Sequence, residues 1–197
     1  MAPGLTSDDL PVATERLTLR PYRPGDAAAL LALLSDPGVV RYLYSEPLRA
    51  EGLSTAMEQR VRPATVEAEG DVVKLAAELR ATGQYVGEMT LFHRSSRDRR
   101  GEIGYVVSPR FSGRGLATEG AAALLRLGFE VVGFHRIEAQ CDGRNLASAR
   151  VMERLGMRRE AHFIKNEFVK GEWTDALVYA VLAEEWRGRG TPGPLSG

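Results

Sequence analysis

A glycine-rich turn between a predicted strand and a predicted helix constrains this chain more than any other segment. The strand reads EIGYVVS (102–108), the turn reads PRFSGRG (109–115), and an apolar helical pattern begins at Leu116. Glycine has no Cβ atom, so Gly113 and Gly115 allow successive backbone N–H groups to surround an anion. A helix start adds unpaired N–H groups and about half a positive charge from the helix dipole. The segment therefore predicts a phosphate-binding site.

The donors of this predicted site come from the backbone and from two arginines. The unpaired N–H groups at the helix start belong to Leu116, Ala117 and Thr118. Arg110 and Arg114 either add charge-assisted hydrogen bonds or are solvated surface side chains. A tight strand-to-helix turn without any ligand is the alternative interpretation of two glycines at this spacing.

The spacing of the turn excludes the two commonest phosphate-binding loops. A P-loop has the pattern G-x-x-x-x-G-K-[ST], and this turn contains no lysine. A dinucleotide-binding turn has a third glycine at the position that Thr118 occupies. The predicted ligand is thus neither a nucleotide on a P-loop nor NAD.

Apolar periodicity along the rest of the chain alternates between strand and helix patterns. Apolar residues at every second position predict strands, as at Val73, Leu75 and Ala77 before the turn ATGQ (81–84). The predicted order is strand, two helices, three strands, helix, strand, helix and two strands. We therefore expect an α/β (α+β) domain with about seven strands and about four helices.

Both ends of the chain differ in composition from the middle. Residues 1–13 and 188–197 are rich in Gly, Pro, Ser and Thr, which predicts a flexible N-terminal extension and a flexible tail. No linker interrupts the middle, and 197 residues suffice for a core that needs neither disulfide nor metal. We expect a single domain at residues 14–187.

Charge and cysteine content exclude several classes of partner. Lys plus Arg and Asp plus Glu number 26 each, so no basic field draws the chain to nucleic acid or anionic lipid. One cysteine and three dispersed histidines provide neither a disulfide nor a metal site. The N-terminus does not have the pattern of a signal peptide, and the longest apolar run is shorter than the ~20 residues of a membrane span. We expect a cytoplasmic protein that binds no metal, nucleic acid or membrane.

Five segments in the correct order match a known family pattern. Arg110, Gly113 and Gly115 fit Arg/Gln-x-x-Gly-x-Gly/Ala, within a turn continuing as GRGLATEG. The other segments read TERLTLRP, EIGYVVSP, RNLASARVMERLGM and GEWTDALVYAVLAEEW. From about residue 14 to about residue 186 the chain resembles the GNAT superfamily of N-acetyltransferases. It looks closest to the ribosomal-protein alanine N-acetyltransferase branch, the RimJ/RimL type.

The resemblance implies a mixed, mostly antiparallel sheet that splays apart between its fourth and fifth strands, and acetyl-CoA as co-substrate. The pyrophosphate would lie on the backbone from Arg114 to Thr118. The pantetheine arm would pair with amide groups of Val106 and Val107, as an added strand does. The N–H of Val106 or Val107 would then stabilise the oxyanion that forms during acetyl transfer.

The segment RNLAS carries two further residues of the implied site. Asn145 and Ser148 match an Asn-x-x-Ser motif in which asparagine contacts the cofactor and serine lies near the sulfur. Ser148 would donate a hydrogen bond to the leaving thiolate. Without the resemblance, Asn145 is a helix N-cap and Ser148 an ordinary first-turn residue.

The resemblance also implies a base for the acceptor amine. Glu102 lies on the predicted fourth strand, where many relatives place a glutamate that deprotonates the amine directly or through water. The alternative is a surface carboxylate paired with an arginine. Glu88 and Glu167 are further candidates. The tyrosine acid of many relatives has no counterpart here, because Met152 and Glu153 occupy that stretch.

Cys141 is a possible nucleophile that would carry the acetyl group during the reaction. It alternates with Ile137 and Ala139 on one face of a predicted strand. This pattern is typical of a small buried residue rather than a reactive thiol. We therefore expect direct transfer of the acetyl group, without an acetyl-cysteine.

The branch implies a protein N-terminal α-amine as acceptor, bound between the first two helices and the last hairpin. Two alternatives remain open at this point. One is acetylation of a small amine such as an antibiotic, polyamine or amino acid. The other is a CoA-binding regulatory module without catalytic activity. Exposed edge strands make a homodimer a further expectation.

Overall fold

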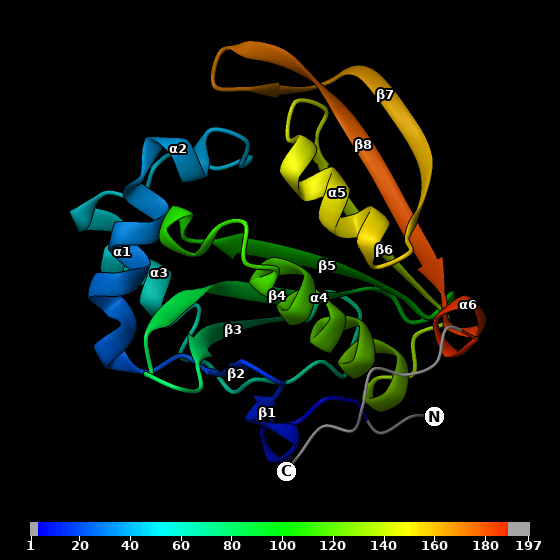
Figure 1. Cartoon of the computed structure of the whole chain (residues 1–197), viewed down its shortest axis with the longest axis horizontal. Helices are drawn as coiled ribbons and strands as arrows, with labels where there is room; N and C mark the ends of the chain where they lie inside the picture. Colours follow the sequence, from blue (N-terminus) through cyan, green and yellow to red (C-terminus); the bar gives the residue numbers. More distant parts are fainter. Residues whose placement is uncertain (1–3, 189–197) are drawn as a thin grey trace.

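A mixed sheet crosses the molecule in the order β1-β2-β3-β4-β5-β6-β8-β7 (Figure 1). The computed structural model describes residues 4–188 of the chain. All neighbouring strands run antiparallel except β5 and β6, which confirms the predicted mostly antiparallel sheet. The strands are β1 (Val12–Ala13), β2 (Leu17–Pro21), β3 (Val72–Leu79), β4 (Tyr85–Ser95), β5 (Arg100–Val107), β6 (Arg136–Asp142), β7 (Arg158–Val169) and β8 (Glu172–Leu182).

Helices cover both faces of the sheet. Leu30 and Met57, from α1 and α3, pack with Ala76 of β3 on one face, and α4 packs on the other. The helices are α1 (Ala27–Ser35), α2 (Pro37–Val40), α3 (Leu53–Glu58), α4 (Leu116–Arg126), α5 (Leu146–Arg154) and α6 (Ala183–Arg187). None of the helices at residues 4–188 is long and apolar enough to cross a bilayer.

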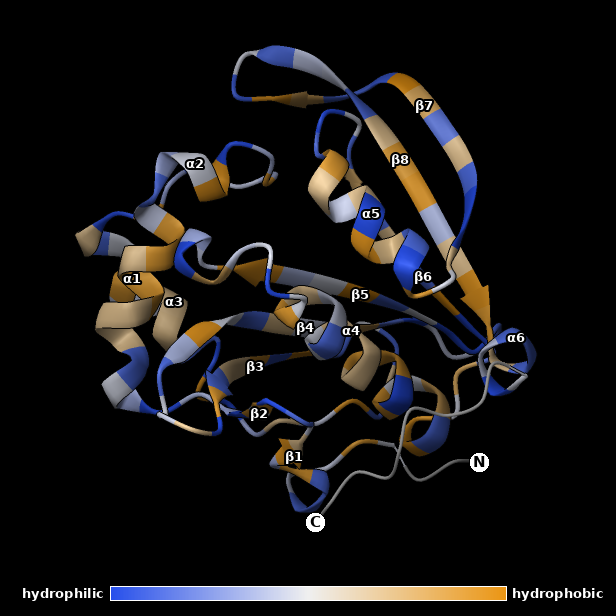
Figure 2. Ribbon diagram, in the orientation of Figure 1, coloured by the Kyte–Doolittle hydropathy of each residue, from blue (hydrophilic) through white to orange (hydrophobic). Residues whose placement is uncertain are grey.

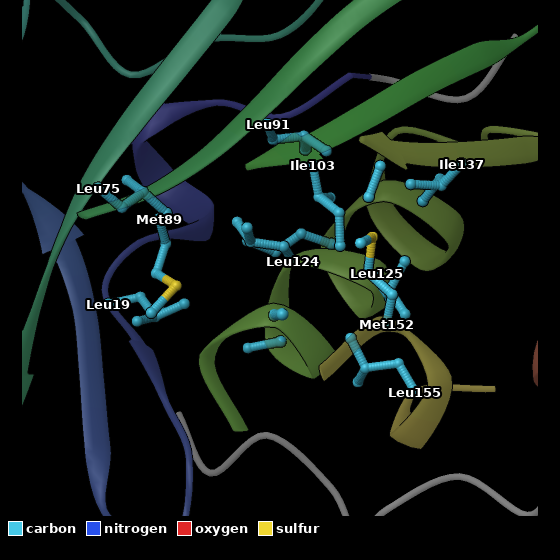
Figure 3. Packing of buried hydrophobic residues seen from close by; sticks show 14 of the residues in the cluster. Leu19, Leu75, Met89, Leu91, Ile103, Leu124, Leu125, Ile137, Met152 and Leu155 are labelled. Carbon is cyan, nitrogen blue, oxygen red and sulfur yellow. The ribbon is translucent and has the colours of Figure 1, made fainter. Parts of the chain in front are cut away.

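The main core lies between the inner strands and α4 (Figure 3). Alternation places Leu75, Met89 and Ile103 on the face of the sheet that α4 covers, and they and Leu124 of α4 are at most 2% exposed. Burial of each such side chain contributes ~1.5–3 kcal/mol. Gly120 lets α4 approach closely, because a Cβ atom there would lie 2.5 Å from Cε of Met89.

The sheet opens between β5 and β6, as the resemblance implies. The two strands pair only where Arg100–Glu102 face Arg136–Glu138. Further along, β5 continues to pair with β4 up to Val107, while β6 pairs with β8. The edge of β5 that faces away from β4 is therefore free of a strand partner from Ile103 onward, among the residues that the structure describes.

The N-terminal segment is more ordered than its composition predicts. Leu5 is fully buried and its backbone pairs with Val66, while β1 pairs with β2. A few apolar side chains thus fix residues 4–13 on the core, although the segment has no apolar periodicity. Residues 1–3 of the predicted extension and 189–197 of the predicted tail lie outside the described residues.

The element counts differ slightly from expectation. The eighth strand is the two-residue β1, and the additional helices are short ones, such as α2 and α6. Such short elements carry too few residues to show a period.

β7 lies at one edge of the sheet and alternates between hydrophilic and hydrophobic residues (Figure 2). Its side chains Phe163, Ile164 and Phe168 are 48 to 67% exposed.

Candidate active site

The glycine-rich turn has the conformation that an anion site requires. Gly113 and Gly115 have left-handed backbones, with φ of 75° and 77°. Gly115 is the N-cap residue of α4. The N–H of Glu119 donates to the carbonyl of Gly115 at 3.0 Å, so the N–H groups of 116–118 precede the helix hydrogen-bond ladder. These groups are the backbone donors that the sequence predicts.

A cavity of about 350 Å³ opens between this turn, the free edge of β5 and α5. Glu102, Arg110 and Arg114 do not line it; both arginines are exposed, and Arg114 lies over the ring of Phe111. The cavity brings together nine of the predicted site residues: Val106, Val107, Gly113, Gly115, Leu116, Ala117, Thr118, Asn145 and Ser148.

Two features of the cavity fit a pyrophosphate. The hydroxyl of Thr118 is buried and has no hydrogen-bond partner among the described residues. Buried polar groups are nearly always paired, so this hydroxyl is available to a ligand in the cavity that Thr118 lines. A Cβ atom on Gly113 would meet nothing within 4 Å, which leaves the space above the turn open. The residues present therefore match the ligand that the sequence predicts.

The start of α5 forms the opposite wall of the cavity. The side chain of Asn145 accepts a hydrogen bond from the N–H of Ser148 at 3.1 Å, so Asn145 is an N-cap residue. The hydroxyl of Ser148 lies 3.0 Å from the hydroxyl of Tyr105 on β5. The carbonyl oxygen of Ser148 also lies 3.0 Å from the Tyr105 hydroxyl and is a second acceptor for its one proton. Both walls are thereby joined across the splay.

Tyr105 is a site residue that the sequence reasoning missed. It lines the cavity together with Val106 and Val107. Burial raises the pKa of Tyr105 well above its usual value, so the phenol stays neutral at physiological pH. Alternation along EIGYVVS places Tyr105 on the same face as Ile103, and that signal was available in the sequence.

Cys141 is buried beside this cluster. It is 5% exposed, and burial raises the pKa of its thiol to about 11. The sulfur lies 3.9 Å from the carbonyl oxygen of Asn145, and the thiol also interacts with the side chain of Ser148. A protonated and enclosed thiol is a poor nucleophile.

The predicted base lies at a distance from the cavity. The carboxylate of Glu102 accepts a hydrogen bond from Nε of Arg94 at 2.8 Å, and its side chain is 20% exposed. Val106 lies four positions further along the strand, or about 13 Å away. Water would have to connect Glu102 to an amine beside Val106.

The two other carboxylates differ in environment. Glu88 pairs directly across from Val106, but its carboxylate is 5% exposed and already bound by Arg60 and the hydroxyl of Tyr22. Glu167 lies on the exposed β7 and accepts a hydrogen bond from Asn166 at 2.9 Å. Glu88 thus forms a structural ion pair, and Glu167 remains accessible from solvent.

The segment after α2 and the β7–β8 hairpin meet beyond the cavity. Nζ of Lys170 donates to the carbonyl of Val40 and, at 2.7 Å, to that of Leu43. Tyr44 lies in this region and is 44% exposed. Burial of its hydroxyl, followed by the charge of Glu167, raises the pKa of Tyr44 to about 12. Leu43 of this segment also lines the cavity.

Comparison with known proteins identifies the arrangement. The family description "Acetyltransferase (GNAT) domain" matches residues 16–158. The uncharacterized N-acetyltransferase YnaD of Bacillus subtilis is 34% identical over 89% of this chain and 98% of its own. A GNAT-family acetyltransferase structure from Bacillus anthracis is 31% identical, with a TM-score of 0.79 over 88% of this chain and 99% of its own.

More distant similarities reach proteins with named acceptors. The putative ribosomal N-acetyltransferase YdaF of Bacillus subtilis is 28% identical over 88% of this chain and 95% of its own. Spermidine N-acetyltransferase from Vibrio cholerae, solved with CoA and spermine, has a TM-score of 0.76 at 19% identity, over 88% of this chain and 99% of its own. Within residues 4–188 no group of three or more His, Cys, Asp or Glu is arranged to hold a metal. The chain belongs to the GNAT family of acetyltransferases.

Proposed function

We propose that this N-acetyltransferase transfers the acetyl group of acetyl-CoA directly to the α-amine at a protein N-terminus. The observation that carries the proposal is one cavity that unites the anion-binding turn, the free edge of β5 and the hydroxyl of Ser148. When bound, acetyl-CoA supplies the acetyl group as a thioester. The exclusion of Cys141 as a nucleophile supports transfer without an acetyl-enzyme.

The turn would hold the charged part of acetyl-CoA. The backbone from Arg114 to Thr118 and the Thr118 hydroxyl bind the pyrophosphate, and the helix dipole of α4 favours its charge. Arg110 and Arg114 add positive charge from the exposed rim. The Oδ1 atom of Asn145 is occupied by its own helix cap, which leaves the amide nitrogen to contact the cofactor.

The free edge of β5 would bind the pantetheine arm and polarise the thioester carbonyl. The N–H of Ser108 donates to the carbonyl of Val86 on β4 at 2.9 Å. N–H groups alternate in direction along an antiparallel strand, so the N–H of Val107 points away from β4. This alternation supports Val107 as the oxyanion donor. The N–H of Val106 points toward β4, where Val106 pairs with Glu88.

Ser148 would donate a hydrogen bond to the thiolate as the C–S bond breaks. The neutral hydroxyl of Tyr105 holds Ser148 in place from the opposite wall by donating its single proton to the Ser148 hydroxyl, which leaves the serine proton for the thiolate. The acceptor nitrogen forms the new C–N bond and releases a proton, which passes through water to Glu102. An α-amine has a pKa of ~7.7–8.0, so an appreciable fraction is neutral near pH 7 and a strong base is not required.

The charged groups around Tyr44, on the segment after α2, support an acceptor with one amine. The carboxylate of Glu102 is paired with Arg94, and that of Asp142 with Arg144. Lys170 adds a positive charge on the same hairpin as Glu167. A polyamine would require several uncompensated carboxylates, whereas a protein N-terminus brings a single charge. The matches to RimJ/RimL-type segments and the similarity to a putative ribosomal N-acetyltransferase support the same acceptor.

Two further expectations belong to this proposal. The exposed apolar residues of the edge strand β7 support a homodimer that pairs through this edge. Size-exclusion chromatography with light scattering would measure the mass of this dimer.

The single cysteine, held as a thiol, supports action in the reducing cytoplasm.

A panel of acceptors tests the proposed reaction. CoA release from acetyl-CoA is measured with tripeptides, with the same peptides blocked at the N-terminus, with spermidine and with an aminoglycoside. We expect turnover with free tripeptides and none with blocked ones. Turnover confined to spermidine or the aminoglycoside would support the small-amine alternative. CoA binding without turnover of any amine would support the regulatory module.

A further inference from the structure

Arg16 contacts the glycine-rich turn from a distant part of the sequence. It precedes β2, and 98 positions separate it from Arg114. Its Nη1 nevertheless donates to the carbonyl oxygen of Arg114 at 2.8 Å. Its Nη2 lies 3.4 Å from the position that a Cβ atom on Gly115 would take. The guanidinium group therefore packs against the turn, where β2 passes beside α4 (Figure 1).

Glu119 in the first turns of α4 holds Arg16 in this position. Its Oε1 accepts from the Thr14 hydroxyl at 2.6 Å and from the backbone N–H of Arg16 at 2.7 Å. Its Oε2 lies 2.7 Å from Nε and 2.6 Å from Nη2 of the Arg16 guanidinium. Burial acts to raise the pKa of Glu119, but the hydrogen bonds from Thr14 and Arg16 outweigh it and lower the pKa. The carboxylate is thus charged at neutral pH.

The contact with Arg114 orients a peptide group of the predicted anion site. The carbonyl of Arg114 and the N–H of Gly115 belong to one planar trans peptide, so they point in opposite directions. Arg16 does not line the cavity, whereas Gly115 does. With the carbonyl held by Arg16, the N–H of Gly115 is directed to the other side of the turn, toward the cavity. Without Arg16, the left-handed glycine is free to rotate this peptide.

We propose that Arg16 and Glu119 are positioning residues for the pyrophosphate: Glu119 fixes Arg16, and Arg16 fixes the Arg114–Gly115 peptide with its N–H toward the ligand. This inference rests on the proposed binding of acetyl-CoA at the turn. Neither residue lines the cavity, so both act through the backbone.

The test compares a ligand that carries the pyrophosphate with one that lacks it. Dissociation constants for CoA and kcat/KM values for acetyl-CoA and S-acetylpantetheine are measured for the wild type and Arg16→Gln. We expect the CoA dissociation constant to rise about tenfold, as for a lost charge-assisted hydrogen bond at a partly exposed site. The value of kcat/KM for S-acetylpantetheine stays within about twofold of the wild type, since that donor never contacts the turn.

Three further variants separate positioning from folding. Arg80→Gln is the matched control, because Nη1 of Arg80 donates to the carbonyl of Thr14 at 2.8 Å without reaching the turn. We expect it to leave CoA affinity unchanged. Arg16→Lys keeps the charge, but an ammonium group cannot contact the Arg114 carbonyl and the Glu119 carboxylate together as a guanidinium does. We therefore expect it to lower CoA affinity as Arg16→Gln does. Glu119→Gln weakens CoA binding in the same direction. Thermal unfolding is recorded for each variant.

The outcomes are distinct. Unchanged CoA affinity in Arg16→Gln or in Arg16→Lys overturns the positioning role. An equal loss with CoA and with S-acetylpantetheine also overturns it, because it reveals a general distortion of the fold. If Arg16→Gln does not fold, CoA affinity and kcat/KM for S-acetylpantetheine are compared in Arg16→Lys and Glu119→Gln instead. A wild-type protein that fails to bind CoA contradicts the proposed function instead.

Discussion

The hydroxyl groups of Tyr105 and Ser148 lie 3.0 Å apart and join β5 to the first turn of α5. They bridge the two walls of the cavity at the point where the sheet has opened. Because burial raises the pKa of Tyr105, its phenol is a neutral hydrogen-bonding group at physiological pH. This pairing supports the proposed role of Ser148 as the donor to the thiolate, with Tyr105 holding Ser148 in place.

Ser148→Ala is expected to lower kcat about tenfold or more while CoA affinity changes little, because the lost bond serves a charge that develops during the reaction. Tyr105→Phe keeps the ring and removes only the hydroxyl, so we expect a smaller loss of kcat. Steady-state kinetics and calorimetric CoA binding measure the two effects. Full activity of Ser148→Ala would remove this residue from the mechanism.

Gly113→Val is expected to abolish CoA binding. A β-branched residue at a φ of 75° is strained, and its side chain occupies the open space above the turn. Gly83→Val is the matched control, because Gly83 has a φ of 69° and equally open surroundings in the turn after β3. Both variants should lose comparable stability in urea unfolding. Retained CoA affinity in Gly113→Val would refute the assignment of the turn.

Cys141 is expected to resist thiol reagents in the folded protein. Burial raises the pKa of Cys141 from 9.0 to about 11. The reactive thiolate is therefore about a hundredfold scarcer at pH 8 in the folded protein than in the unfolded chain, where the thiol is exposed. Reaction with a disulfide reagent is followed at pH 8 with and without denaturant. Rapid labelling of the native protein would contradict the buried placement of the thiol.

Gly120→Ala is expected to destabilise the fold by ~1–3 kcal/mol, since it adds a methyl group to a filled core. The added Cβ would lie 2.5 Å from Cε of Met89, which is itself fully buried, so the thioether would have to shift within the core. Met89→Val shortens that side chain and should recover part of the loss in the double variant. Urea unfolding checks this; additive losses in the double variant would argue against the clash.

Glu160→Gln is expected to destabilise the protein at pH 7 but not in acid. Glu160 on β7 binds Arg136 on β6, and the hydrogen bonds from Arg136 lower its pKa from 4.5 to about 2. A depressed folded pKa gives stability that is complete above pH 4.5 and disappears as the pH falls toward 2. The difference between wild type and variant in urea unfolding should therefore shrink below pH 4.5. A constant difference would contradict the ion pair.

Local patterns in the sequence predicted most of the fold. Alternating apolar residues identified the β3–β4 and β7–β8 hairpins, and both are present. The N-cap at Asn145 was also readable, because a cap uses only neighbouring residues. The fixed conformation of residues 4–13 could not be predicted in this way, because it depends on contact between Leu5 and Val66, which are far apart in the chain. Burial of that kind depends on the complete core.

The sequence by itself determined the strand–turn–helix unit with Gly113 and Gly115, because steric freedom and helix ends are properties of a few adjacent residues. Only the tertiary structure decided that Tyr105 meets Ser148 and that Arg16 holds the carbonyl of Arg114. It also placed Glu102 against Arg94, away from the cavity. Periodicity specifies which face a side chain occupies, but its partner is chosen by how distant strands and helices pack.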